Sequence, residues 1–426
     1  MNRSSRYRAT IGGCALAALI SPQVHASSFA VRENSSEGIA TAFSSDVSAA
    51  DSAASAFNNP AAMTQLHGNQ IEAGAVAAFP TINFHGTATS GGRPVSGNNG
   101  NNAGRLGVAP NFYAVLDLSD RVKLGLALTT PFALSVKQNA GWYGRYLAID
   151  TAIMSTNINP SVAYKINEKI AIGVGVSAQW LQGTLAQGFN QGALGAPDAL
   201  VRFKGDDWAF GYNLGAFFKP WHRTQLGVTY RSKISHQLHG DFNFLRVATP
   251  LGGALVSGAA LLDVPLPAST TFGITQTVSP HLTVSLTAQW TQWSAFKYIN
   301  IQSTTATAPI NLGFSDTWFT SIGATYQLND AWTLRGGIGW DQSPVDNRYR
   351  TVNIPDQDRY MVGLGFGYKI SDALTLDGAY AHYFAPNASM NGSVNNTDNN
   401  PFGATLLNGT YQLSLDYVSM SVRYKF

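Results

Sequence analysis

Apolar and polar residues alternate strictly at the end of the chain, along residues 418–426. Successive side chains of a β-strand point to opposite faces, so this pattern predicts a strand with one apolar and one polar side. The apolar side carries Val418, Met420, Val422, Tyr424 and Phe426, and the polar side carries Ser419, Ser421, Arg423 and Lys425. Such a strand leaves an open edge unless another strand pairs with it. We expect its partner to be the first strand, near Gln70.

The same period of two recurs from Gln70 onward, in segments separated alternately by short turns and long polar loops. About fourteen strands are expected, near residues 70–84, 104–118, 121–134, 152–167, 169–184, 205–219, 222–236, 268–279, 281–302, 315–328, 331–342, 358–370, 373–385 and 411–426. The short connections are Ser119-Asp120, Asn167-Glu168, Pro220-Trp221, Ser279-Pro280, Asn329-Asp330 and Ser371-Asp372. Asn, Asp, Ser and Pro favour such turns because they cap the backbone or preset φ.

The long connections, such as residues 90–102 and 387–408, are rich in Gly, Asn and Thr. Alternation of short and long ends is typical of outer-membrane barrels, which have short periplasmic turns, long outer loops and an even number of strands. A soluble β-sandwich has strands at similar spacing but does not repeat this alternation six times. The sequence therefore predicts an all-β fold, in which residues 70–426 form a fourteen-stranded antiparallel transmembrane β-barrel.

The parity of each strand also assigns its two faces. In residues 170–180 and 282–291, the apolar set is expected to face lipid and the small or polar set the lumen. Charges of the other parity then point inward, namely Arg231, Lys233, Arg335, Asp341, Arg359 and Lys369. A charge that faces lipid at mid-depth costs about 2–4 kcal/mol, which favours this assignment. Aromatic residues near strand ends are expected to form interfacial girdles: Trp180, Trp221, Trp290, Trp332 and Trp340.

Composition favours a barrel over a soluble enzyme. Only 12% of residues are charged, against roughly 25% in soluble domains. Aromatic residues make up 11% of the chain, and there are 42 glycines. Mean hydropathy is -0.04, and no apolar run is long enough for a spanning helix, which excludes a helical membrane protein.

The beginning of the chain predicts an export signal peptide over residues 1–26 and a mature start at Ser27. Its features are the basic residues Arg3, Arg6 and Arg8, an apolar core over residues 11–20, and a cleavage site at Val24-His25-Ala26. Removing the three arginines leaves 24 basic residues against 24 acidic ones, so no nucleic-acid partner is implied. The single cysteine, Cys14, also leaves, which excludes thiol and thiolate–metal chemistry in the mature chain.

Residues 27–69 do not alternate and are rich in Ser and Ala. They contain short helix-compatible pieces, and Asn59-Pro60-Ala61 predicts a stop followed by a new helical turn. The segment is too polar to form a core alone, so within a barrel it is expected in the lumen, as a plug or hatch. A periplasmic tail is the alternative.

A search for catalytic and metal-binding motifs gives no candidate. The chain has no nucleophile elbow, Walker loop or His-Glu-x-x-His motif. His236 and His239 form an isolated pair in a predicted loop, without acidic or cysteine partners for a metal. Gly363, Gly365 and Gly367 alternate along a strand, which makes room inside a barrel and is not a dinucleotide loop. The sequence therefore predicts no catalytic residues, no metal and no cofactor.

Two features point to a transport function. Pro131 lies within a segment that otherwise predicts a wall strand, and proline cannot donate to the ladder. It marks either a break that opens the wall sideways or simply the strand end. Residues 252–266 and 185–201 are apolar for outer loops, which indicates either binding of an apolar molecule or packing between loops.

The chain resembles the FadL/TodX family of outer-membrane channels for hydrophobic substrates. The similar motifs follow the family order over nearly the whole chain, and the last two are the most specific. They are Phe29 with Asn34-Ser35-Ser36-Glu37-Gly38, the hatch motif Asn58-Asn59-Pro60-Ala61, Asn159-Pro160-Ser161-Val162-Ala163-Tyr164, Thr229-Tyr230-Arg231-Ser232, Asp341-Gln342-Ser343-Pro344-Val345 and Ile354-Pro355-Asp356-Gln357-Asp358-Arg359.

This resemblance implies a passive channel in the bacterial outer membrane that captures long-chain fatty acids or similar hydrophobic molecules at its outer loops. The ligand would pass to an inner pocket reached by Phe29 and leave sideways at a kinked third strand, where Pro131 lies. Arg231 and Arg359 match positions near a fatty-acid carboxylate, which an inward arginine can bind. Salt bridges between wall and plug are the alternative for both. The resemblance also implies contact with outer-membrane lipid and a monomer.

Three other functions remain open. A channel for toluene-like aromatic hydrocarbons would share the fold but lack a cation at the headgroup position. An outer-membrane lipid hydrolase would need a Ser–His–acid set, and no histidine is expected beside a suitable serine. A general porin would have no plug and would conduct small solutes.

Overall fold

The computed structural model describes residues 28–248, 251, 256–303, 307–392 and 405–426. The predicted signal peptide lies outside the described residues. No helix among the described residues is long and apolar enough to cross a membrane.

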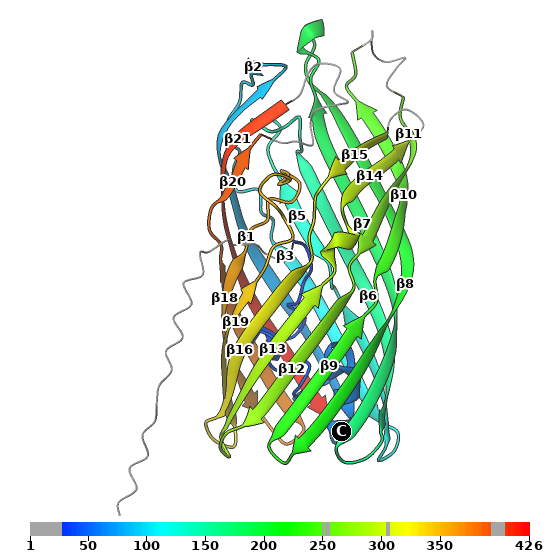
Figure 1. The fold of residues 1–426 in the computed structure, drawn as a ribbon, viewed down its shortest axis with the longest axis vertical. Coiled ribbons are helices and arrows are strands. Elements are labelled where there is room, and N and C mark those ends of the chain that lie inside the picture. The colour runs from blue at the N-terminus through cyan, green and yellow to red at the C-terminus, as the bar shows by residue number, and fades with distance from the viewer. Residues whose placement is uncertain (1–27, 249–250, 252–255, 304–306, 393–404) are drawn as a thin grey trace, which may run out of the picture.

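The chain forms a closed antiparallel β-barrel with short helical elements at its N-terminal end (Figure 1). The helices are α1 Ser36–Ala40 and α2 Ser55–Asn58, and the 3-10 segments are η1 Pro60–Gln65, η2 Gly192–Leu194 and η3 Trp293–Ala295. The strands are β1 Gln70–Ser90, β2 Arg93–Pro94, β3 Gly107–Asp117, β4 Val122–Thr129, β5 Ala133–Lys137, β6 Asp150–Lys165, β7 Ile170–Phe189, β8 Ala199–Trp221, β9 Thr224–Arg231, β10 Ile234–Leu245, β11 Gly258–Leu266, β12 Ser269–Thr277, β13 Leu282–Thr291, β14 Tyr298–Ser303, β15 Thr307–Asn311, β16 Thr317–Gln327, β17 Trp332–Asp341, β18 Arg359–Lys369, β19 Leu374–Phe384, β20 Ala388–Asn391 and β21 Thr405–Lys425.

These segments make fourteen wall strands, as predicted, because β4–β5, β9–β10, β11–β12, β13–β14, β15–β16 and β19–β20 are each one interrupted strand, and the two-residue β2 only forms a short hairpin with the end of β1. The last strand closes the barrel on the first. β21 pairs with β1 from Gln70 opposite Lys425 to Ser90 opposite Thr405, so the expected partner of the terminal strand is confirmed.

The facing of the strands follows the predicted parity over most of the wall. Ile170, Ile172, Val174 and Val176 are between 40% and 52% exposed on the lipid side. Arg335 and Asp341 are buried on the lumen side. The expectation for Lys233 was wrong: it is exposed because an irregularity at Ser232 reverses the parity between β9 and β10. Lys369 keeps the predicted parity of β18 and lies exposed at the short-turn end beside Asp372.

Two local expectations were also wrong. The turn after β8 does not lie at Pro220-Trp221, because β8 continues through Trp221 and the turn falls at His222-Arg223. His236 and His239 lie in β10 and not in a loop. Their side chains point to opposite faces, so they cannot form one metal site.

The N-terminal segment, residues 28–69, runs inside the lower half of the barrel (Figure 1). α1 contacts β17, β18, β19 and β21, whereas η1 contacts β4, β6, β7 and β8 on the other side. Asn59 caps η1: its Oδ1 accepts a hydrogen bond from Ala61 N at 3.1 Å, and Pro60 is the first residue of the turn. Its Nδ2 donates to Val47 O and to Ala216 O of the wall, at 2.7 and 3.1 Å.

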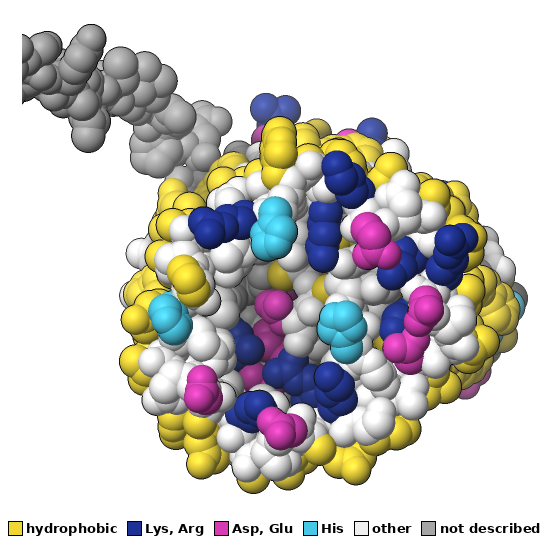
Figure 2. Space-filling model, turned by 90° about the horizontal axis from the view of Figure 1, so that it is seen from below, with side chains coloured by type: hydrophobic (Ala, Val, Ile, Leu, Met, Phe, Trp, Pro, Cys, Tyr) yellow, Lys and Arg dark blue, Asp and Glu magenta, His cyan; other side chains and the backbone are white. Residues whose placement is uncertain are grey.

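Charged side chains gather at the end of the barrel that carries the short turns. Figure 2 looks into this end and shows acidic side chains deep in a central hollow, with basic side chains around them. Arg423 of β21 lies 3.3 Å from Asp377 and 3.5 Å from Glu37 of α1, and Arg335 lies 2.9 Å from Asp377. Ion pairs therefore tie the N-terminal segment to the wall at this level.

Glycines of the wall lie where the N-terminal segment touches it. A Cβ on Gly337 would lie 2.2 Å from Thr41 O, and one on Gly227 would lie 1.7 Å from Val47 O. Both distances are far below van der Waals contact, so no other residue fits without movement of the backbone. We call the five wall glycines that approach the backbone of this segment in the same way the glycine seat: Gly173, Gly227, Gly323, Gly337 and Gly363. It explains why Gly363 stands in a strand.

Gly337→Ala is expected to displace the N-terminal segment. Overpacking of this kind destabilises by about 1–3 kcal/mol, and we expect that loss in urea unfolding in detergent, together with increased ion conductance in planar bilayers. Gly336→Ala is the matched control, because its Cβ would meet nothing closer than Leu364 Cδ2 at 3.4 Å. Equal behaviour of the two variants would show that the seat is not under steric constraint.

Candidate functional site: an inner chamber beside a break in the wall

A cavity of about 150 Å³ lies inside the barrel, above the N-terminal segment; we call it the chamber. Its lining mixes apolar groups, such as Phe57, Phe132 and Leu266, with polar ones, such as Gln289 and Arg231. Small-molecule sites typically have this composition, mostly apolar with a few placed polar groups. The chamber is therefore the candidate site for a hydrophobic ligand with one polar end.

The third wall strand breaks beside the chamber. β4 ends at Thr129 and β5 begins at Ala133, so Pro131 interrupts the strand, which then continues. β3 and β4 pair as far as Phe112 and Leu128. We call the gap beyond this point the window. It spans residues 105–111 and 129–135, and a bridge between Gly104 and Val136 closes its outer end.

Prolines stand on both edges of the window. They are Pro110 of β3 and Pro131, and neither residue can donate a backbone hydrogen bond into the gap. The N-terminal segment lines the inner side: Val31 N donates to Pro131 O at 2.8 Å, and Ala133 N donates to Phe29 O at 3.1 Å. Ala30 and Val31 of this strip line the chamber together with Pro131 and Phe132 of the wall.

Phe29 fills an apolar pocket above the chamber. Its side chain is 3% exposed, and its ring centroid lies 4.9 Å from that of Trp293, 5.8 Å from Phe296 and 6.0 Å from Phe132. Leu181, Phe203, Leu238 and Leu262 complete the cluster. Besides the N-terminal segment, six different strands or loops contribute these side chains, so the pocket could not be read from sequence.

Arg231 lies on the chamber wall at the end of β9. Its guanidinium stacks on the ring of Phe57 at 3.6 Å and donates to Phe57 O. No carboxylate among the described residues pairs with it, so it is a cation without an acidic partner in that part of the chain. Such a group attracts an anion, because a charge in a low-dielectric site needs a partner.

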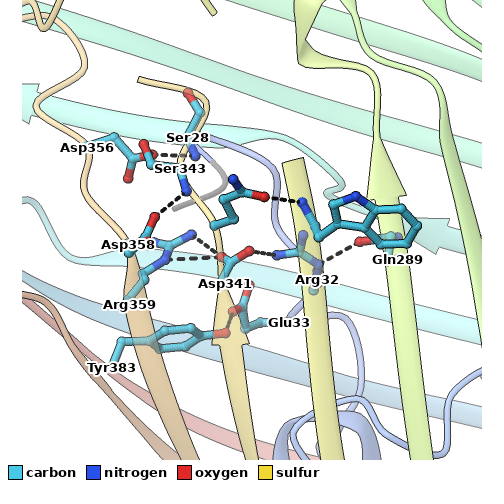
Figure 3. A network of polar contacts seen from close by, with 12 residues as sticks. Ser28, Arg32, Glu33, Gln289, Asp341, Ser343, Asp356, Asp358, Arg359 and Tyr383 are labelled. Carbon is cyan, nitrogen blue, oxygen red and sulfur yellow. Dashed lines mark hydrogen bonds and ion pairs between the residues drawn. The ribbon is translucent and has the colours of Figure 1, made fainter. Parts of the chain in front are cut away.

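Arg359 has a different role. It and Arg32 of the N-terminal segment converge on Asp341 from two sides (Figure 3), with ion-pair distances of 3.0 and 2.9 Å. Arg359 also stacks over Tyr383, and it does not line the chamber. The two predicted arginines are therefore not brought together: Arg359 is in a network between wall and N-terminal segment, and Arg231 faces the cavity.

Residues 342–358 fold over the beginning of the N-terminal segment. Ser28 N and Ser343 Oγ both donate to Asp356 Oδ2 at 2.7 Å, and Ser343 N donates to Asp358 Oδ1 at 2.8 Å (Figure 3). Burial raises the pKa of Asp356 to about 6. Burial, with the nearby charges of Asp356 and Asp341, raises the pKa of Asp358 to about 8. This network holds the N-terminal segment at its start, next to Phe29.

Some site residues were missed in the sequence. Pro110 could have been found by the argument applied to Pro131, because it too stands within a predicted wall strand. The pairing of Arg32 with Asp341, 309 residues apart, had no local signal. Among the described residues, no group of three or more His, Cys, Asp or Glu is placed to hold a metal.

The fold and the site define a transmembrane barrel whose lumen holds its own N-terminal segment and an inner chamber. The chain belongs to the outer membrane protein transport family (OMPP1/FadL/TodX), whose model matches residues 17–426. It is therefore a protein of the bacterial outer membrane, and the members of this family are transport channels.

Relatives of this chain include two named long-chain fatty acid transport protein, from Escherichia coli K12 and from Salmonella typhi. Each is 27% identical over 78% of this chain and 82% of the relative. The crystal structure of a Pseudomonas aeruginosa FadL homologue is 26% identical with a TM-score of 0.87, covering 94% of this chain and all of that one. The toluene transporter TodX of P. putida, at 18% identity and TM-score 0.69, covers 92% of this chain and 98% of its own and shares the fold.

Asp341→Ala is expected to release the N-terminal segment, because it leaves Arg32 and Arg359 without their shared carboxylate. Breaking a buried pair in this way destabilises by about 3–5 kcal/mol, which urea unfolding in detergent measures. Asp372→Ala is the control, since that carboxylate is 98% exposed and its pair with Lys369 is worth little. A loss at Asp341 no larger than at Asp372 would contradict the assigned role.

Proposed function

We propose that this protein is a passive channel that takes up hydrophobic molecules, with long-chain fatty acids as its substrates. The observation that carries the proposal is Arg231, a cation without an acidic partner among the described residues, in a largely apolar chamber that adjoins a break in the wall. A fatty acid has the matching chemistry, one carboxylate and one apolar chain. The names of the E. coli and Salmonella relatives support the same substrate class.

The route begins at the outer loops and leads through the pocket that Phe29 fills. An acyl chain that enters this pocket must displace the Phe29 side chain. The aromatic and aliphatic residues that surround Phe29 then contact the acyl chain instead. Because Phe29 and Val31 bond to the strand break at Ala133 and Pro131, moving Phe29 also pulls on the strip that lines the window. Binding and opening are thereby coupled, and the ligand leaves sideways through the window into the membrane.

The N-terminal segment serves as the hatch. Asn59, Pro60 and Ala61 hold its turn against the wall, and the glycine seat and the ion pairs of Arg423 keep it across the lumen. Water-soluble molecules are then excluded from a direct path, which distinguishes the protein from a general porin. The channel is proposed to act as a monomer in contact with outer-membrane lipid.

Aromatic hydrocarbons are the second candidate substrates, because TodX and a toluene transporter of Ralstonia pickettii share this fold. Arg231 favours the fatty acid, since a neutral hydrocarbon gains nothing from a cation. A lipid hydrolase is disfavoured: the hydrogen bonds of His236 go to Asp207 and Gln179, and that of His382 to Asp416, with no serine among these partners.

The first test is uptake of labelled oleate by cells that lack their own fatty-acid channel and express this protein. Thr130→Val with Pro131→Val, which favours a continuous third strand, is expected to lower uptake, whereas Pro220→Ala at the short-turn end should leave it unchanged. Heat-modifiable migration on gels checks that the barrel of each variant is folded. No oleate uptake by the folded wild type would refute the fatty-acid proposal and favour toluene-like substrates, and unchanged uptake in the double variant would refute lateral exit at Pro131.

A second test isolates the headgroup contact. Arg231→Gln removes a charge-assisted hydrogen bond worth about 1.5–3 kcal/mol, so oleate affinity should fall about 10- to 100-fold. Binding of a neutral analogue, the methyl ester, should change little. Arg223→Gln is the control, because it removes an exposed arginine at the turn after β8. Equal losses for acid and ester would mean that Arg231 supports the chamber without contacting the carboxylate.

A further inference from the structure

A second gap in the wall adjoins the same chamber. β8 pairs with β9 as far as Asn213 opposite Arg231, and it pairs with β10 again only from Asp206 opposite His239. Between these points, residues 207–212 of β8 face residues 232–238 without ladder pairing; we call this gap the seam. β8, β9 and β10 lie side by side on the right of Figure 1.

The seam is close in size to the window and lies at a similar height. At the window seven residues of each strand lack ladder pairing with the neighbouring strand, and at the seam six and seven residues do. Both begin roughly 20 Å above the short-turn end at the usual rise and tilt of barrel strands, within the outer half of the apolar band. A simple β-bulge places two residues of one strand opposite one residue of the other. The seam is longer than such a bulge.

One backbone hydrogen bond and two bonds to side chains take the place of the missing ladder in the seam. Ser232 N donates to Tyr212 O and Tyr212 N donates to Ser232 Oγ, both at 2.9 Å. Higher up, Asp207 Oδ2 accepts from Gln237 N at 3.2 Å. An open ladder in hydrocarbon leaves costly unsatisfied groups, and these three hydrogen bonds satisfy only part of them. The two strands can therefore separate with few backbone hydrogen bonds to break.

The side chain of Ile234 lies on the inner side of the seam. Ile234 is buried against Gly211, where a Cβ would lie 2.6 Å from Ile234 Cγ1. The chamber reaches this point, because Tyr212, Ser232 and Ile234 are among its lining residues. Moving Ile234 away from Gly211 would join the chamber to the lipid side of the wall.

The chemistry on the two sides of the seam suits an amphiphile with a carboxylate. Arg231 lies at its inner end, and Lys233, two residues later, is exposed on the outer face because the parity reverses there. Aromatic side chains cover the lipid side of β8 next to the seam: Trp208, Phe210 and Tyr212 are 52%, 71% and 49% exposed. Such side chains are enriched where apolar and polar surroundings meet.

We propose that the seam between β8 and β10 is a second lateral portal, through which a carboxylate-bearing hydrophobic molecule passes between the chamber and the outer leaflet. Ile234 is its shutter, and Arg231 and Lys233 bind the carboxylate in turn on the two sides. This proposal rests on the proposed uptake function and adds a route to it, so that the window is one of two exits.

A reversible disulfide across the seam tests it. Cysteines in the variant Gly211→Cys with Ile234→Cys lie at the spacing that a disulfide requires, and the mature chain is expected to hold no other cysteine. The pair is introduced into the variant with Thr130→Val and Pro131→Val, which closes the window. Uptake of labelled oleate is then measured with the pair oxidised and after reduction with dithiothreitol.

We expect the window-closed variant to retain part of the wild-type uptake, and oxidation to lower that remainder to the level of cells without the channel, with recovery on reduction. Each single cysteine serves as the control for the oxidant. An oxidised pair that leaves the remainder unchanged, or no remainder at all, overturns the second portal. Both results leave the proposed function standing as long as the wild type takes up oleate. Failure of the wild type to take up oleate would overturn the proposed function itself.

A charge variant gives a separate readout. Lys233→Gln in the window-closed background should lower the remaining uptake of oleate but not that of its methyl ester, because only the acid needs a cation outside the seam. Lys204→Gln is the matched control, because it removes an exposed lysine higher on β8. Loss of both substrates alike, or of neither, would contradict the role of Lys233.

Discussion

The backbone of the N-terminal segment lies directly against the barrel wall, and the rest of the lumen depends on this contact. Five wall glycines leave room for carbonyl and amide groups of residues 39–61, at distances that no side chain permits. With the segment held there, its beginning runs upward along the third strand, where Phe29 reaches the aromatic pocket. The chamber is the space that this arrangement leaves between segment, pocket and wall.

Charge pairing divides the lumen into structural and functional parts. Asp341 pairs with both Arg32 and Arg359, and Asp377 pairs with both Arg335 and Arg423, so these arginines are held in place by ion pairs. Arg231 is stacked on an aromatic ring instead. In a low-dielectric cavity a paired charge is satisfied, whereas a stacked one still favours an anion, which explains why only one of the two arginines is a ligand-binding residue in our proposal.

The wall itself combines closure with local weakness. A closed barrel removes strand edges, which membranes do not tolerate in contact with lipid. The window and the seam are two long interruptions beside the chamber, and apolar side chains line each of them: Phe29 and Phe132 at one, and Ile234 at the other. A hydrophobic ligand can replace such side chains at little loss of apolar contact, whereas water cannot.

Several features were determined by the sequence alone, because they depend on local periodicity. Alternation of apolar and polar residues fixed the strands, their facing and the fourteen-strand count, and Pro131 and the Asn59-Pro60 turn marked breaks through their covalent geometry. Other features depended on contacts between distant residues. Parity could not foresee the reversal at Ser232 that turns Lys233 outward, since one irregular residue shifts everything after it. Whether Arg231 or Arg359 is paired was likewise decided only in the folded barrel, where Asp341 lies beside one and Phe57 beside the other.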